Sequence, residues 1–173
     1  PLETWNSNTL GTLNLLEILR NYNKKIIVVI ITSDKVYYNV EKKGSYKETD
    51  LLGGKDPYSS SKAGAEIAIK SFYDSYLKDK KNVKLAIARA GNVIGGGDWS
   101  KGRLIPDCVR AWSRNKSVNI RNFKSTRPWQ HVLEVIYGYM LLALNLNKGR
   151  KISGEAFNFG PHTSKNYSVK DCL

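Results

Sequence analysis

Apolar residues in the first half of the chain follow helical spacing in some segments and strand-like runs in others. Leucines recur every third residue within residues 8–20, which predicts an amphipathic helix, and Gly11 inside it suggests close backbone packing there. Residues 26–31 are an unbroken run of isoleucine and valine, typical of a strand buried on both faces of a parallel sheet. Helical spacing returns over residues 59–77, and a strand pattern over residues 83–89. This order predicts an α/β fold with a doubly wound parallel sheet.

The remaining segments are less regular. Residues 36–57 are polar and contain several glycines, so we expect a long loop, and loops of this length are usually functional. Beyond residue 98 we expect a helix, a short strand, an apolar helix and a last strand, at residues 104–112, 118–122, 133–146 and 156–159. We therefore divide the chain into a nucleotide-binding layer, residues 1–98, and a partial substrate-binding region, residues 99–173, with segments that return to the core.

Composition indicates one soluble domain. Of the 173 residues, 41% are hydrophobic and 25% are charged, as in ordinary globular proteins. No apolar run approaches the roughly 20 residues needed to cross a bilayer, and residues 1–20 read as a helix rather than a signal peptide. The two cysteines, Cys108 and Cys172, lie far apart in the sequence without metal-type spacing. We expect reduced thiols, no metal site and a cytoplasmic location.

The formal net charge of +13 raises the alternative of a basic, non-enzymatic binding module. Its lysines, however, occur in short groups such as Lys24-Lys25 and Lys80-Lys81, at expected helix ends and loops, where they favour solubility. No basic stripe alternates with aromatic residues, and no nucleic-acid-binding motif is present. A positive field also suits an anionic small molecule. We therefore expect neither a nucleic acid nor a membrane as partner.

One pair of residues carries recognisable chemistry. Tyr58 and Lys62 are four residues apart at the start of a helical pattern, so their Cβ atoms would lie roughly 5–6 Å apart on one face. A phenol with a pKa of about 10 is a poor base at neutral pH, but a nearby ammonium group favours the phenolate. Ser33, at the end of the preceding strand, could hold the reacting oxygen of a substrate. This arrangement is typical of hydride transfer to a nicotinamide, although no glycine-rich phosphate loop precedes it in the sequence.

These residues belong to a longer series of motifs, which occur in the order Thr32–Lys35, Gly53–Lys62, Arg89–Trp99, Arg103–Asp107 and Arg127–Glu134. With them the chain resembles the nucleotide-sugar 4,6-dehydratases of the extended short-chain dehydrogenase/reductase family, over nearly its whole length. The branch that acts on CDP-glucose matches best. The resemblance implies a partial Rossmann-like domain whose glycine-rich half is not in this chain, because family members are about twice as long. We therefore expect the isolated chain to be inactive and to bind NAD⁺ weakly.

The resemblance also implies an activity. CDP-glucose would become CDP-4-keto-6-deoxyglucose through NAD-mediated oxidation at C4, loss of water across C5 and C6, and return of the hydride to C6. Tyr58 would take the C4 hydroxyl proton, Lys62 would bind the nicotinamide ribose and Ser33 would orient the C4 oxygen. Asp34 would be the general acid and Lys35 the general base. Lys35 favours the CDP-glucose branch, because relatives that act on dTDP-glucose have a glutamate there.

The remaining assignments from this resemblance concern binding. Ser7 and Val93 would contact NAD, and the substrate would contact Asn92, Arg103, Arg121 and Arg127. Ser7 could equally cap a helix, and Asn92 could be a turn residue. We interpret the tryptophans mainly as packing residues, with Trp99 nearest the site. Similar proteins form homodimers or larger oligomers. An epimerase or reductase of the same fold, in which Asp34 and Lys35 have no catalytic part, stays open as an alternative.

Overall fold

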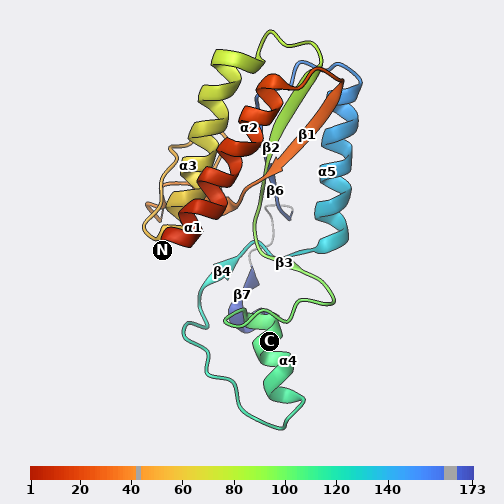
Figure 1. Cartoon of the computed structure of the whole chain (residues 1–173). Coiled ribbons are helices and arrows are strands. Elements are labelled where there is room, and N and C mark those ends of the chain that lie inside the picture. Colours follow the sequence, from red (N-terminus) through yellow and green to blue (C-terminus); the bar gives the residue numbers. More distant parts are fainter. Residues whose placement is uncertain (42–43, 162–166) are drawn as a thin grey trace.

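The computed structural model describes residues 1–41, 44–161 and 167–173, and its centre is a parallel sheet. The strands are β1 (Ile26–Ile31), β2 (Val83–Ala90) and β6 (Ala156–Phe159), in the order β1-β2-β6. Figure 1 shows helices on both sides of this sheet. The prediction of an α/β fold with a parallel sheet is confirmed.

One face of the sheet is covered by the two helical segments that the sequence predicts. The first runs through α1 (Leu2–Trp5), a π-helical turn η1 (Asn6–Leu10) and α2 (Gly11–Asn21). The second consists of α3 (Pro57–Phe72) and a π-helical turn η3 (Tyr73–Leu77). Their apolar faces meet the sheet in a core that contains Leu16, Leu19, Ile69, Leu77, Leu85 and Ile87. The expected close packing at Gly11 is wrong, because an added Cβ would meet only the Asn6 carbonyl of its own helix, at 3.7 Å.

The other face is covered by α5 (Val132–Asn147), in agreement with the predicted apolar helix. Its inner residues Leu142 and Leu146 pack against Ala86 and Ala88 of the sheet in a second core. Its outer residues are also apolar and lie more than half exposed, among them Leu133, Tyr137, Met140 and Leu144.

Strand β1 differs from its prediction. The run of branched residues predicts burial on both faces, yet Ile31 at its end is 51% exposed. The reason is that β1 pairs with β2 along one edge only, and no strand of the described residues pairs with its other edge.

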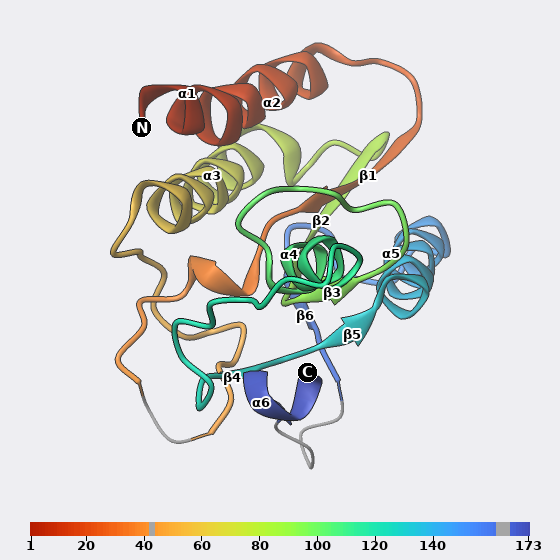
Figure 2. The same ribbon diagram turned by 90° about the horizontal axis from the view of Figure 1, so that it is seen from below.

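A group of short elements lies at one end of the sheet, below it in Figure 1. It contains α4 (Leu104–Trp112) as predicted, the parallel pair β3 (Val93–Ile94) and β5 (Gln130–His131), the antiparallel pair β4 (Thr126–Arg127) and β7 (Tyr167–Ser168), and α6 (Val169–Cys172). Viewed from below, α4 is seen nearly end-on in front of the sheet (Figure 2). The predicted strand at residues 118–122 is wrong, because this segment is largely exposed and pairs with no strand in the part of the chain that the structure describes.

The predicted loop at residues 36–57 is largely irregular, as expected, although residues 42 and 43 lie outside the described residues. It follows a short 3-10 turn, η2 (Asp34–Val36), and is closed by a bridge between Tyr37 and Leu52. Within the described part of the chain, no helix has both the length and the apolar character needed to cross a membrane.

Candidate active site

A cavity of about 830 Å³ lies beyond the carboxyl ends of β1 and β2. Three stretches of chain line it: residues 33–35 after β1, residues 91–99 after β2, and residues 101–106 at the start of α4. Tyr58 and Trp129 add to its wall. Ligands of open α/β sheets bind at the carboxyl ends of the strands, so this cavity is the candidate site.

The first wall begins where β1 ends. Ser33 has an extended backbone and caps the turn η2, since its Oγ accepts a hydrogen bond from the Lys35 amide at 3.2 Å. The same hydroxyl donates to Oδ1 of Asp34 at 3.1 Å. Burial raises the pKa of the Asp34 carboxyl, and the Ser33 hydroxyl and the positive charge of Lys35 offset only part of this effect. Asp34 therefore holds its proton more tightly than an exposed aspartate does.

The start of α3 sets the position of Tyr58. Asp56 caps this helix, and its Oδ1 accepts hydrogen bonds from the amides of Tyr58 at 2.9 Å and of Ser59 at 3.0 Å. The hydrogen bond from the Ser59 hydroxyl is the main reason why the pKa of Asp56 is lowered. Tyr58 is thereby held at the rim of the cavity, 43% exposed, with Nζ of Lys35 at 5.8 Å from the centre of its ring.

Lys62 lies one turn farther along α3. Its side chain is half-buried, and burial lowers the pKa of its amine. Among the residues that the structure describes, this amine has no hydrogen-bond or ion-pair partner.

The second wall follows β2 and approaches the first closely. The Asn92 carbonyl accepts a hydrogen bond from the Gln130 amide at 3.0 Å, which brings β3 beside β5. A Cβ added to Gly91 would lie 2.4 Å from Cγ of Pro128 and 3.2 Å from Oδ2 of Asp34. Glycine is therefore needed for the chain after β2 to pass between the Asp34 carboxyl and the Pro128 ring.

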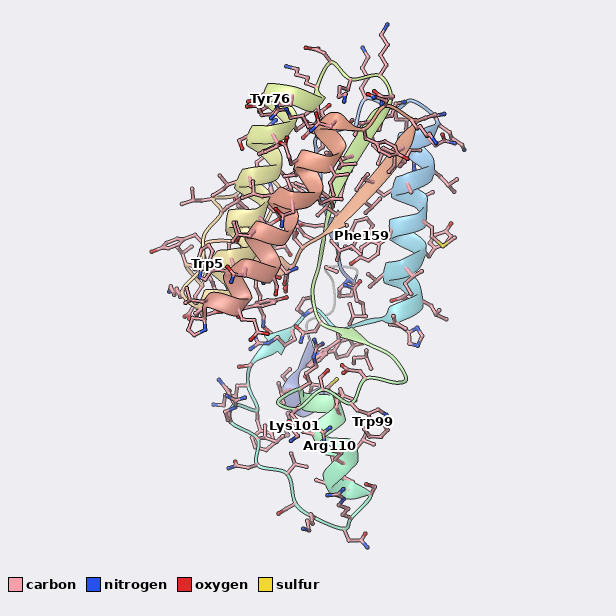
Figure 3. All side chains as sticks on the ribbon, in the orientation of Figure 1. Trp5, Tyr76, Trp99, Lys101, Arg110 and Phe159 are labelled. Carbon is pink, nitrogen blue, oxygen red and sulfur yellow. The ribbon has the colours of Figure 1, made fainter. Side chains whose placement is uncertain are left out.

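The third wall is the loop before α4. Arg110 of α4 holds this loop, because its Nη1 donates to the Trp99 carbonyl at 2.6 Å and its Nη2 to the Ser100 carbonyl at 3.3 Å. Trp99 is 61% exposed and lines the cavity. Figure 3 shows Trp99, Lys101 and Arg110 gathered around the start of α4. Arg103, whose guanidinium lies 3.6 Å from the Asp98 carboxylate, belongs to the same wall.

With this geometry established, comparison with known proteins identifies the family. A family model described as GDP-mannose 4,6 dehydratase matches residues 1–168. The chain belongs to this family.

Other members and neighbours of the dehydratase family are similar in sequence and structure. The chain is 48% identical over 166 residues to the CDP-glucose 4,6-dehydratase of Salmonella typhimurium. This match covers 93% of the chain and 46% of that protein. The structure of dTDP-glucose 4,6-dehydratase from Bacillus anthracis, in complex with NAD, is 28% identical with a TM-score of 0.75, and the match covers 95% of this chain and 49% of that one. A proposed epimerase from Burkholderia cenocepacia is also 28% identical, with a TM-score of 0.81, over 100% and 52% of the two chains.

These comparisons confirm the resemblance and the Rossmann-like character of the sheet. The chain spans about half the length of the relatives it matches.

The structure brings some of the predicted site residues together and leaves others apart. It gathers seven of them around the cavity: Ser33, Asp34, Lys35, Tyr58, Asn92, Val93 and Arg103. Lys62 and Arg127 do not line it, although Lys62 shares the helix of Tyr58 and the charge of Arg127 reaches Asp34. Ser7 is exposed in η1, and Arg121 is exposed in the segment after α4.

Sequence reasoning missed two features, one at the cavity and one between η1 and α3. Trp129 is assigned to packing in the sequence analysis, yet it lines the cavity, and its indole N–H is buried without a hydrogen-bond partner among the described residues. Asn8 and Thr9, next to Ser7, tie η1 to α3 through the hydroxyl and the carbonyl of Ser61, at 2.9 and 2.8 Å. The only indication of these two bonds in the sequence is that Asn8 and Thr9 are polar residues within an apolar helical pattern.

Proposed function

We propose that the chain is part of a nucleotide-sugar 4,6-dehydratase that converts CDP-glucose to CDP-4-keto-6-deoxyglucose. Two observations support this proposal. The chain is 48% identical to a curated CDP-glucose 4,6-dehydratase, and Ser33, Asp34, Lys35 and Tyr58 surround one cavity. The second observation carries the proposal, because elimination of water from a sugar needs an acid and a base in addition to the residues that serve oxidation.

The described residues fit the nicotinamide end of NAD. Among the described residues the half-buried amine of Lys62 has no partner, so its hydrogen-bonding capacity would serve the hydroxyls of a ribose. Tyr58, one turn away, would face the reacting end, with Val93 and Ser7 as further contacts. When bound, NAD⁺ would supply the acceptor for a hydride from C4 of the sugar. The turn that would hold its pyrophosphate is not in this sequence.

Each proton transfer up to the loss of water can be assigned to a residue of this chain. The Ser33 hydroxyl would orient the C4 oxygen, and Tyr58 would take the proton of the C4 hydroxyl. Lys35 would remove the proton at C5, which a neighbouring ketone makes acidic. Asp34 would protonate the C6 hydroxyl as it leaves, and burial favours this role because it raises the pKa of the carboxyl.

Positive side chains near the cavity suit the diphosphate of the substrate. Arg103 lines the cavity and Arg127 lies near Asp34, and guanidinium groups pair with phosphate oxygens in bidentate fashion. We assign the diphosphate to these two residues, with Arg121 as a third contact, and a sugar hydroxyl to Asn92. In this arrangement residues 1–98 supply the cofactor contacts and the groups that act on the sugar, and residues 99–173 supply the contacts to the diphosphate. A homodimer or larger oligomer, located in the cytoplasm, completes the proposal.

The test is an assay of a full-length version of the protein with CDP-glucose. A 4,6-dehydratase yields a 4-keto-6-deoxy sugar, which is recognised by its absorbance in alkali. We expect Asp34→Asn to reduce product formation by about 100-fold or more, because loss of a general acid removes a factor of this size. Glu41→Gln, an exposed carboxylate away from the cavity, is the matched control and should leave the rate unchanged. Normal turnover by Asp34→Asn would count against the dehydratase mechanism.

An epimerase of the same fold is the second candidate, since one of the similar structures is a proposed epimerase with a TM-score of 0.81. The same assay separates the two. An epimerase would return a sugar inverted at C4 that still carries its C6 hydroxyl, and its rate would not depend on Asp34.

A further inference from the structure

A buried polar network lies directly behind the candidate active site. Its centre is the ion pair between Glu66 of α3 and Arg89 of β2, whose side chains are 1% and 4% exposed. Nε of Arg89 donates to both carboxylate oxygens of Glu66, at 3.0 and 2.9 Å, and Nη2 donates to one of them. The pair is therefore bidentate, which fixes direction as well as distance.

The network reaches the segment that contains Ser33, Asp34 and Lys35 from both ends. On one side, the hydroxyl of Thr32 donates to Oε1 of Glu66. On the other side, Nη1 of Arg89 donates to the hydroxyl of Tyr37 at 2.8 Å. Thr32 immediately precedes Ser33, and Tyr37 immediately follows the turn η2. The two hydroxyls thus enclose the whole segment between them.

The same network reaches the helix that carries the tyrosine and lysine pair. Tyr58, Lys62 and Glu66 follow one another at intervals of four residues, so they lie along one face of α3. Beyond Arg89, the Tyr37 hydroxyl donates to Oδ1 of Asn158 at 2.6 Å, which adds β6 to the network. One set of hydrogen bonds therefore joins α3 to the segment after β1, to β2 and to β6.

Stability alone does not require such a network. A buried ion pair costs desolvation energy, and apolar residues of similar size at such positions are often as stable or more stable. A bidentate pair with two attached hydroxyls instead restricts where its neighbours can lie. Catalytic groups have to be held within about 0.5 Å of their working positions, which is a restriction of this kind.

We propose that Glu66 and Arg89, acting through Thr32 and Tyr37, are positioning residues that hold Ser33–Val36 against the face of α3 that carries Tyr58 and Lys62. This inference rests on the proposed function. None of the four touches the cavity, so their effect on the reaction is indirect.

The experiment removes one hydroxyl at a time and leaves the buried charges paired, because loss of Glu66 or Arg89 would leave a buried charge alone and strongly destabilise the protein. Thr32→Val and Tyr37→Phe keep the shape of each side chain. Thr32→Ser keeps the hydroxyl that Thr32→Val removes, so this variant should retain the properties of the parent. Thr12→Val and Tyr139→Phe are matched controls, since the Thr12 hydroxyl donates to the Asn8 carbonyl of its own helix segment and Tyr139 packs on the opposite face of the sheet.

Two measurements test the variants, namely steady-state kinetics and hydrogen exchange. In a full-length version, Thr32→Val should lower kcat with CDP-glucose by about tenfold and change KM by less than about twofold, because misplacement affects the reacting groups more than the binding of substrate. In the isolated chain, hydrogen exchange should become faster in residues 33–37 and stay unchanged in α5. Thr32→Ser and both controls should match the parent in both measurements.

The possible failures are distinct. If the full-length parent does not convert CDP-glucose, the proposed function is wrong, and the exchange measurement still tests the network. If the parent is active but kcat and exchange in Thr32→Val and Tyr37→Phe equal those of the parent, the positioning role is wrong. Equal losses in the controls and in the two test variants would also overturn it, because the effect would then be one of general stability.

Discussion

Asp34 shows how its surroundings can prepare one side chain for a task. It has an ordinary hydrogen bond from Ser33 and lies near the positive charges of Lys35 and Arg127, all of which favour the carboxylate. Burial outweighs them together and raises its pKa. A buried carboxyl with a raised pKa lowers the free energy of unfolding when it is ionised. This effect on stability can be measured without any substrate.

The effect predicts how stability changes with pH in Asp34→Asn. The folded-state pKa lies above the unfolded value of 3.8, so the folded chain binds the proton more tightly, and stability falls as pH rises through this interval. The asparagine variant, which cannot ionise, should therefore be more stable than the parent at pH 7. The difference should disappear below pH 3.8. Urea unfolding across this range measures it, and a parent that is equally stable at pH 7 would contradict the prediction.

Single residues divide into those that the sequence could reveal and those that it could not. Ser33, Asp34 and Tyr58 were predictable because fixed spacing within short motifs brings them to one edge of the sheet. The burial of Asp34 depends on Gly91 and Pro128, which are distant in sequence, so no local pattern reports it. The partner of Glu66 is 23 residues away, and a glutamate at that place in an amphipathic helix reads as solvent-exposed.

At the scale of elements, periodic spacing was a reliable guide and short segments were not. The long helices were predicted because many residues share one period, and β1 because its run of branched residues is unbroken. The strand predicted at residues 118–122 rested on Val118 and Ile120 alone, and strands of this length form only where a partner is present. The π-helical turns η1 and η3 leave the apolar spacing nearly unchanged, so they could not be recognised in the sequence.

The passage between β2 and β3 is the element most sensitive to a small change. Gly91→Ala would place a methyl group against the Pro128 ring, and overpacking of this kind costs typically about 1–3 kcal/mol. We expect a loss of unfolding free energy in this range, measured by urea denaturation. Gly96→Ala is the control, because an added Cβ there meets nothing within 4 Å. Equal stability of the two variants would show that the proline moves aside without cost.

At the scale of the whole molecule, the residues expected near the nicotinamide are present and the pyrophosphate turn is not in the sequence. A pyrophosphate gains most of its binding from a glycine-rich turn at a helix N-terminus. We therefore expect the isolated chain to bind NAD⁺ with a dissociation constant of about 1 mM or weaker, which corresponds to a binding free energy of roughly −4 kcal/mol. Isothermal titration measures this, with the full-length version as control. A micromolar affinity of the isolated chain would contradict it.

Among the described residues one edge of β1 has no partner strand, and together with the apolar outer side of α5 this edge has a practical consequence. The edge presents amides and carbonyls in register, and the helix presents Leu133, Tyr137, Met140 and Leu144 toward solvent. A separately synthesised polypeptide that supplies a matching strand and an apolar helix side would complete hydrogen bonding and burial at once. An exposed strand edge beside apolar side chains favours association with other polypeptides, so these two surfaces are where we expect the isolated chain to aggregate first.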